Sequence, residues 1–256
     1  MTRPRTRNCL FFLLVFFLPV FLLVSCDDLT SPPPVDLSGK VLDLLTLGPV
    51  AGATVEFADE SRSTTTGEEG CDLNPPAASC GSWTLQGVPT PTAGDPDPLI
   101  RITAKKFAVS YNAFPLSLGI LQYDLMVLSS GAFFVLPFLM TGGLLPADGC
   151  LVLGAVVGFV STGYTQVVAQ LAGAAINVVP NDLTVVYFGE TGLPDPDLTA
   201  TSALGLFGVV VPDATAVTSI TLSGSRPGSL LAAPASNPVF PGSFVLGGLI
   251  DVNYTP

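Results

Sequence analysis

The stretch SGKVLDLLTLGPVAGATVEFADE at residues 38–60 decides the fold of this chain. Val41 begins one extended segment, and residues 53–57 (ATVEF) alternate with the period of two that places one face of a strand in a core. The pairs GP at 48–49 and AG at 51–52 supply turn residues between them. The stretch therefore predicts two successive strands, the second with one buried face.

Further strands are expected on the C-terminal side of this stretch. SWTL at 82–85 and LIRITA at 99–104 alternate in the same way, and segments rich in Gly, Pro and Asp separate them. The 26 glycines and 24 prolines of the chain favour strands and turns over helices. Short strands at this spacing are typical of an all-β fold built as a β-sandwich.

The second half of the chain repeats the order of these segments. Residues 151–160 correspond to the opening segment, 171–178 to the ATVEF strand, 205–212 to the segment around SWTL, and 217–222 to LIRITA. Four segments in the same order indicate an internal repeat. We therefore expect two tandem β-sandwich domains.

This order resembles the carboxypeptidase regulatory-like domain, which has a transthyretin-like fold of the wider Ig-like class. The shared features are a G-x-V opening, a G-A-x-V strand and a G-x-aromatic-x-hydrophobic strand that ends at Val-Pro. The residues that carry the resemblance are Gly39, Val41, Gly52, Ala53, Val55, Gly81, Trp83, Leu85, Val88 and Pro89, and in the second copy Gly154, Val156, Gly173, Ala174, Ile176, Gly205, Phe207, Val209, Val211 and Pro212. The resemblance implies non-catalytic sandwiches that space, bind or stabilise.

The first 25 residues have the features of a secretory signal peptide. Residues 1–8 carry three arginines and no acid, and residues 9–24 form an apolar run. The run closes as LVSC at 23–26, which resembles the lipobox of bacterial lipoproteins. That resemblance implies cleavage before Cys26 and lipid on its thiol, which would anchor the chain to a bilayer without spanning it. Asp27 resembles an inner-membrane retention signal, and the choice of membrane stays open.

The chain divides into five expected segments. The signal peptide at 1–25 precedes an acidic, proline-rich tether at 26–37, which should run extended. A first sandwich at 38–118 and a second, divergent one at 149–256 flank an apolar connector at 119–148.

The connector contains a long uncharged run of 23 residues. Residues 125–147 carry no charge, but Ser, Gly and Pro interrupt the run. Asp124 and Asp148 also bracket it too closely for a membrane span. We expect a short helix at about 132–140, packed between the two sandwiches so that they are docked rigidly.

Composition excludes several classes of function. The chain has no histidine, which removes Ser-His-Asp and Cys-His catalysis and His-ligated zinc. Cleavage before Cys26 would remove three of the nine basic residues and leave six against 20 acidic ones, a formal charge of −14. Such a surface repels nucleic acid. We expect no enzyme, no cofactor, no metal and no nucleic-acid partner.

The remaining cysteines have two different expected roles. Cys71 and Cys80 bracket the loop CDLNPPAASC, and in an oxidising compartment we expect them to form a disulfide that stabilises by roughly 2 to 3 kcal/mol. Cys150 has no partner and begins an apolar strand, which favours a small buried side chain over intermolecular pairing.

Two further features have both a structural and a functional interpretation. The turns DPD at 95–97 and DPD at 195–197 could offer oxygen to calcium, but neither supplies the six or more ligands that calcium prefers, so solvated turns are expected. Trp83 is the only tryptophan, and its place in an alternating strand favours burial over a sugar-binding role.

The leading hypothesis is a non-enzymatic, lipid-anchored module of the bacterial cell envelope, structural or binding in role. Its expected partners are the bilayer, through acylated Cys26, and an envelope protein or glycan. One alternative is a carbohydrate-binding accessory lipoprotein, which would require exposed aromatics along one sheet face. The other is an envelope hydrolase without histidine, which would require two suitably spaced carboxylates.

Overall fold

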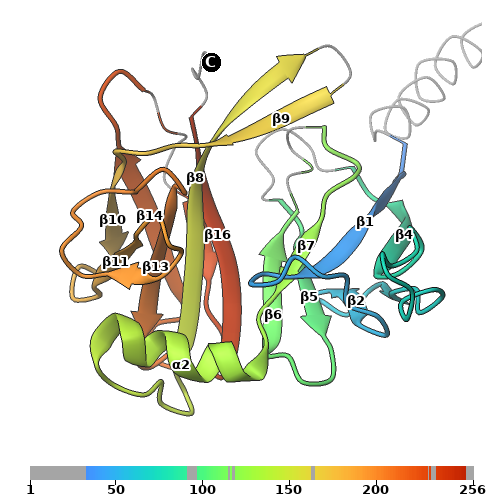
Figure 1. Cartoon of the computed structure of the whole chain (residues 1–256), viewed down its shortest axis with the longest axis horizontal. Coiled ribbons are helices and arrows are strands. Elements are labelled where there is room, and N and C mark those ends of the chain that lie inside the picture. The colour runs from blue at the N-terminus through green and yellow to red at the C-terminus, as the bar shows by residue number, and fades with distance from the viewer. Residues whose placement is uncertain are drawn as a thin grey trace, which may run out of the picture.

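The computed structural model describes residues 33–90, 97–114, 116, 119–162, 165–229, 231 and 235–251. This part of the chain is built mainly of strands and loops, with the single helix α2 at one end (Figure 1). Cys26 and the rest of the signal and lipobox region lie outside the described residues. A chain that begins at Asp27 keeps every described residue, because the first of these is residue 33.

The first half is a sandwich of two sheets. Strands β4, β1 and β7 form one sheet, and β3, β2, β5 and β6 lie in the sheet opposite. The core between them includes Val55, Trp83 and Ile100. The strands are β1 (Val35–Asp43), β2 (Thr54–Phe57), β3 (Ser63–Thr65), β4 (Ser82–Val88), β5 (Leu99–Thr103), β6 (Val109–Ala113) and β7 (Leu125–Val127).

The second half is a sandwich of the same kind. Strands β13, β8 and β16 form part of one sheet, and β10, β14 and β15 form the sheet that packs on it. Its core includes Val152, Phe207 and Leu222. The strands are β8 (Cys150–Thr162), β9 (Thr165–Gln170), β10 (Ala175–Val179), β11 (Val185–Phe188), β12 (Pro194–Asp195), β13 (Leu206–Val211), β14 (Ser219–Ser225), β15 (Ala235–Pro238) and β16 (Ser243–Asp251).

One sheet runs through both halves. Its order is β12-β11-β13-β8-β16-β6-β5-β2-β3, with β9 paired to β8. Strand β16 is parallel to both of its neighbours, so that Val245 lies opposite Val152 on β8 and opposite Tyr111 on β6. Residues that pair across a sheet share a face. The first core, with Val55, therefore lies on one face, and the second core, with Val245, on the other.

Helix α2 (Ser130–Thr141) covers the face of this sheet that the second core leaves open. Leu136 and Met140 pack there on Leu151 and Phe244. The Ser129 hydroxyl accepts a hydrogen bond from the Ala132 N–H at 3.3 Å, and Gly142 ends the helix in the left-handed conformation. The short helix expected at 132–140 is thus present with slightly wider bounds. No helix in the described ranges is long and apolar enough to cross a membrane.

Two expected boundaries need correction. Strand β1 begins at Val35, inside the segment expected to be tether, because Leu37 continues the period-two pattern of Val41 and is fully buried. Strand β7 lies inside the expected connector, yet it pairs with β1 in parallel and buries Leu125 in the first core. The first sandwich therefore includes residues on both sides of the 38–118 range.

The strand pairings of the first half recur in the second. Strands β1 and β4 pair as β8 and β13 do, β2 and β5 as β10 and β14, β5 and β6 as β14 and β15, and β1 and β7 as β8 and β16. Gly39 lies opposite Trp83 as Gly154 lies opposite Phe207. The segment 217–222 is out of register, because Gly224 lies opposite Ile176 where the first half has Ile102 opposite Val55.

Candidate functional site

The shared sheet has an open face in the first half, opposite the first core. Glu56, Arg101 and Tyr111 lie side by side on it, one on each of β2, β5 and β6. All three are half-buried, whereas their neighbours Val55 and Ile100, which point into the core, are buried. The alternation that buries every second residue of these strands thus also presents the polar row on the other side.

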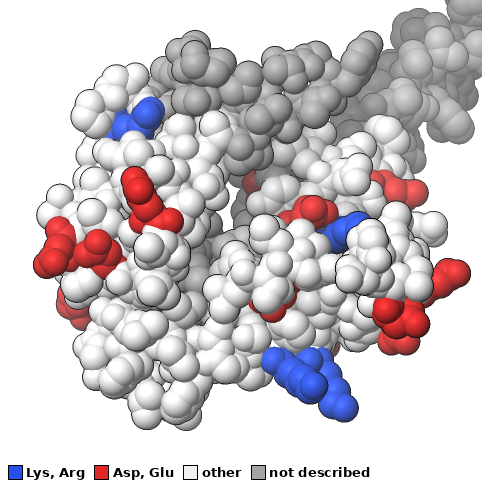
Figure 2. Space-filling view, viewed as in Figure 1, with Lys and Arg blue, Asp and Glu red and all other residues white. Residues whose placement is uncertain are grey.

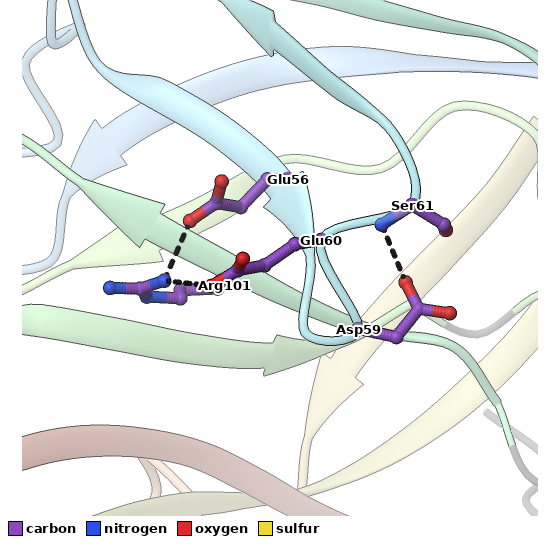
Figure 3. A network of polar contacts seen from close by, with 5 residues as sticks. All are labelled: Glu56, Asp59, Glu60, Ser61 and Arg101. Carbon is purple, nitrogen blue, oxygen red and sulfur yellow. Dashed lines mark hydrogen bonds and ion pairs between the residues drawn. The ribbon is translucent and has the colours of Figure 1, made fainter.

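Arg101 is the centre of this row and binds two carboxylates (Figure 3). Its Nη1 lies 3.0 Å from Oε1 of Glu56, the residue directly opposite on β2, and 3.3 Å from Oε1 of Glu60 in the turn that follows. The Arg101 side chain is 31 % exposed and that of Glu60 72 %, so solvent weakens the second contact more than the first. We call Glu56, Glu60 and Arg101 the charged triad.

The turn between β2 and β3 is ordered by its own polar contacts. The Asp59 carboxylate accepts a hydrogen bond from the Ser61 N–H at 3.0 Å (Figure 3). The bond to the Ser61 side chain, followed by this backbone bond, lowers the pKa of Asp59. This contact holds the turn that carries Glu60 above the sheet face.

An aromatic contact joins the open face to the second half. The Tyr111 ring on β6 stacks on Phe240, which precedes β16, with ring centroids 3.9 Å apart and planes 17° apart. Burial raises the pKa of Tyr111, and nearby Arg101 opposes this shift. Tyr111 also packs against the second core. The candidate site therefore lies at the seam between the two halves.

The chemistry available to the charged triad is limited by its own pairing. Both carboxylates bind the same guanidinium, so neither is free of a charged partner. The Arg101 Nε is buried and makes no hydrogen bond among the described residues. Within the same residues, no three His, Cys, Asp or Glu side chains are placed to hold a metal ion. The arrangement can support recognition of a polar ligand or a neighbouring chain.

The cysteines occupy different environments. Cys71 and Cys80 are joined by a disulfide with an S–S distance of 2.00 Å across nine positions of sequence. Cys150 is a free thiol and is fully buried at the start of β8, with its Sγ 3.7 Å from the Ser243 hydroxyl. Burial raises the pKa of the Cys150 thiol.

The other residues singled out in the sequence do not form a site. Trp83 is 3 % exposed, packs edge to face on Phe114 at 6.0 Å, and cannot act as a sugar platform. In the turn at 195–197, Asp195 accepts a hydrogen bond from the Asp197 N–H at 3.1 Å. In the turn at 95–97, residues 95 and 96 lie outside the described part of the chain.

Sequence reasoning missed the residues of the open face. The strands at 53–57 and 99–104 were expected, and their period of two places Glu56 and Arg101 on the solvent side. That signal was available, but the direct opposition of the two residues depends on strand register, which a single strand does not reveal. Phe240 carries no local signal at all, because its partner Tyr111 lies in the other half of the sequence.

Comparisons with known proteins give little beyond the general fold. No family model matches this sequence, and no curated protein matches it. Among solved structures, the shaft pilin SpaA from Lactobacillus rhamnosus GG aligns with 11 % identity and a TM-score of 0.25, covering 88 % of this chain and 99 % of that one. GBS52, the minor pilin of Streptococcus agalactiae, aligns with 11 % identity and a TM-score of 0.27, covering 87 % and 98 %. Similarity at this level defines neither a shared family nor a shared function.

Proposed function

We propose that this chain is a non-enzymatic lipoprotein of the bacterial cell envelope, whose two sandwiches act as one rigid structural or binding module. The proposal combines a secretory leader that ends in the lipobox-like LVSC at 23–26 with a folded body. The Cys71–Cys80 disulfide supports export, because disulfides persist in oxidising compartments.

The observation that carries the mechanical part of the proposal is the position of β16. This strand is hydrogen-bonded to β8 of the second half and to β6 of the first, so backbone hydrogen bonds cross the seam. The Tyr111–Phe240 stack adds a side-chain contact at the same place. Two surfaces on opposite halves are thereby held at a fixed distance, as a spacer or scaffold requires.

The repeated pairings also support the proposed kinship with carboxypeptidase regulatory-like domains. The glycines at the matched positions Gly52 and Gly173 have positive φ values of 64° and 77°, as do Gly81 and Gly205 at 72° and 64°. Glycine adopts this conformation readily, so both copies use it for the same structural reason.

Carbohydrate binding is a weaker candidate. Along the open face, Tyr111 is the aromatic side chain that the described strands present, and Phe240 already covers one face of its ring. A hydrolase is weaker still, because Glu56 and Glu60 share Arg101. A glycan array probed with the chain from Asp27 tests this candidate. Glycan binding by wild type that Tyr111→Ala abolishes would support carbohydrate recognition at the open face.

The anchor is tested by metabolic labelling with palmitate in a bacterial host. We expect label in the wild-type chain and in Cys9→Ser, because Cys9 lies in the leader, and loss of label in Cys26→Ser. Mass spectrometry of the labelled protein should show an N-terminus at residue 26. An unlabelled protein, or one that still begins at Met1, would overturn the proposed anchor.

The module itself is tested by cross-linking in intact cells. A photo-reactive residue at position 101 samples the open face, and one at position 150 samples the buried core as a control. A specific partner captured from position 101 would identify a binding role. The same capture from both positions would contradict a defined binding face.

A further inference from the structure

Helix α2 exposes an apolar face that no described residue covers. Its buried side chains, such as Leu136 and Met140, point towards the shared sheet. The residues of the opposite face are 48 to 61 % exposed: Phe134, Val135, Phe138 and Leu139, together with Leu144 just after the helix. We call these five residues the α2 face. A surface helix is ordinarily polar on its outer side, so a contiguous apolar face of this kind marks an interaction surface.

The α2 face lies in an uncharged stretch of the sequence, beside a turn that carries two lysines. No charged residue occurs in residues 125–147, and Figure 2 shows the end of the molecule that α2 occupies as largely uncharged, with a basic group beside it. The exposed Lys105 and Lys106 lie in the turn between β5 and β6, at the same end as α2 (Figure 1). They are two of the six basic residues that follow Cys26.

The lysine turn is fixed to the helix. The N–H of Ser130, the first residue of α2, donates a hydrogen bond of 2.9 Å to the Lys106 carbonyl oxygen, and Phe107 forms a β-bridge with Ser129. Positive charge is therefore held beside the N-terminal end of the apolar face, in a chain whose net charge is strongly negative.

We propose that the α2 face and the two lysines dock on the surface of an anionic lipid bilayer. An in-plane helix binds a bilayer by burying an apolar face rich in Phe and Leu at the head-group boundary, while basic residues nearby attract anionic lipid. Phe134, Phe138 and Leu139 supply the first element and Lys105 and Lys106 the second.

A second copy of the chain fits this surface less well. Two α2 faces that met about a two-fold axis would bring two lysine turns together and would also oppose two strongly acidic bodies. An anionic bilayer instead complements the lysines. Strand β12 lies beside α2 and carries Asp195. The Asp195 carboxylate accepts a hydrogen bond from the Asp197 N–H and forms no ion pair with either lysine in the described part of the chain.

This docking is independent of the proposed lipid on Cys26. The described chain enters β1 at the end of the molecule away from α2 (Figure 1). A chain that begins at Asp27 lacks both the leader and the lipidated cysteine but keeps the α2 face and the lysine turn. Vesicle binding by that chain therefore tests the face alone, and palmitate labelling of the full chain tests the anchor alone.

The experiment is co-sedimentation of the chain from Asp27 with vesicles of phosphatidylglycerol and phosphatidylcholine. We expect wild type to bind these vesicles. In Lys105→Gln/Lys106→Gln, the affinity for the vesicles should fall about fivefold for each lysine removed. Binding should fall at least tenfold in Phe134→Gln/Phe138→Gln, because the apolar contact is lost. Wild type and the lysine variant should bind equally weakly to vesicles of phosphatidylcholine alone, which carry no anionic lipid.

Matched controls separate these effects from general changes in charge or apolar surface. Lys40→Gln/Arg62→Gln removes two positive charges elsewhere, and Leu73→Gln/Leu121→Gln removes two exposed leucines of the first half. Both controls should bind as wild type does, and buried Trp83 reports that every variant is folded. Absent vesicle binding, or equal losses in variants and controls, would overturn the proposal. The proposal would also fail if the chain did not bind vesicles but formed a dimer that Phe134→Gln/Phe138→Gln dissociated.

Discussion

Two buried threonines perform the same task in the two halves. The Thr66 hydroxyl donates to the Val50 carbonyl at 2.8 Å and accepts from the Ala53 N–H at 2.9 Å. The Thr201 hydroxyl donates to Leu171 at 2.8 Å and accepts from Ala174 at 3.0 Å. Each hydroxyl thus satisfies two backbone groups at the turn before β2 or β10, and this explains why these two polar side chains are buried.

Replacing either threonine by valine should destabilise the protein. The shape is kept, but a buried carbonyl and a buried N–H lose their partner, so Thr66→Val and Thr201→Val should each lower the free energy of unfolding by about 2 to 4 kcal/mol. Urea denaturation followed by Trp83 fluorescence measures the change. Thr65→Val is the control, because Thr65 is exposed and valine suits a strand. A loss below 0.5 kcal/mol at Thr66 would contradict this role.

The Cys150 thiol should make stability depend on pH in the alkaline range. Burial raises its pKa above the ordinary value of 9.0, so the unfolded chain ionises first. The contribution is complete below pH 9 and is lost as the pH rises through the folded pKa. We expect wild type to lose more stability than Cys150→Ala between pH 8 and pH 10.5. Tyr123, whose pKa burial also raises, is common to both proteins, so only their difference reports the thiol. Equal losses would show that the thiol is solvated.

At the scale of elements, local alternation predicted the strands with one buried face. The ATVEF segment at 53–57 contains β2, and the segments around Trp83 and Ile100 contain β4 and β5. The match of Val88 to Val211 also holds, because a bulge in β4 absorbs one additional residue between Leu85 and Val88. In these strands, the alternation of a wet and a buried face is visible in the sequence.

Two of the strands that were not anticipated lack that contrast. Strand β7 (Leu125–Val127) lies in an uncharged apolar stretch, so its alternation has no polar side to reveal it. Strand β16 was not predicted, and it is the central strand that joins the halves, with apolar residues on both faces. The open face of the candidate site was implicit in the positions of Glu56 and Arg101, but its stack with Phe240 depends on this long-range pairing.

Gly154 on β8 is required by its aromatic partner. A Cβ at Gly154 would overlap the Phe207 ring, which lies directly opposite on β13. We expect Gly154→Ala to lower the free energy of unfolding by about 1 to 3 kcal/mol, because an overpacked core must shift. Gly131→Ala is the matched control, since nothing lies within 4 Å of its added Cβ and alanine favours a helix, so stability should rise by up to about 1 kcal/mol. Thermal denaturation of both variants should therefore shift in opposite directions, and a tolerated Gly154→Ala would contradict the observed pairing.

At the scale of the whole molecule, the two cores lie on opposite faces of one sheet. The first core is closed by β4, β1 and β7 and the second by β10, β14 and β15, while α2 covers the remaining apolar face beside the first core. Neither half can lose its part of the shared sheet without exposing the edge of β16 or β6. This arrangement couples the halves more tightly than a flexible connector would.

The coupling predicts that both halves unfold together, and each half contains its own probe. Trp83 lies in the first core, and Cys150, the free thiol among the described residues, lies in the second. In the chain from Asp27, the urea midpoint of Trp83 fluorescence should coincide with the midpoint at which Cys150 becomes reactive towards a thiol reagent. In Val245→Pro, proline removes a backbone donor from the strand that both halves share, so the two midpoints should fall by the same amount. If the variant moved the Cys150 midpoint and left the Trp83 midpoint in place, the seam would be a contact between independent domains, and the rigid-module proposal would lose its physical basis.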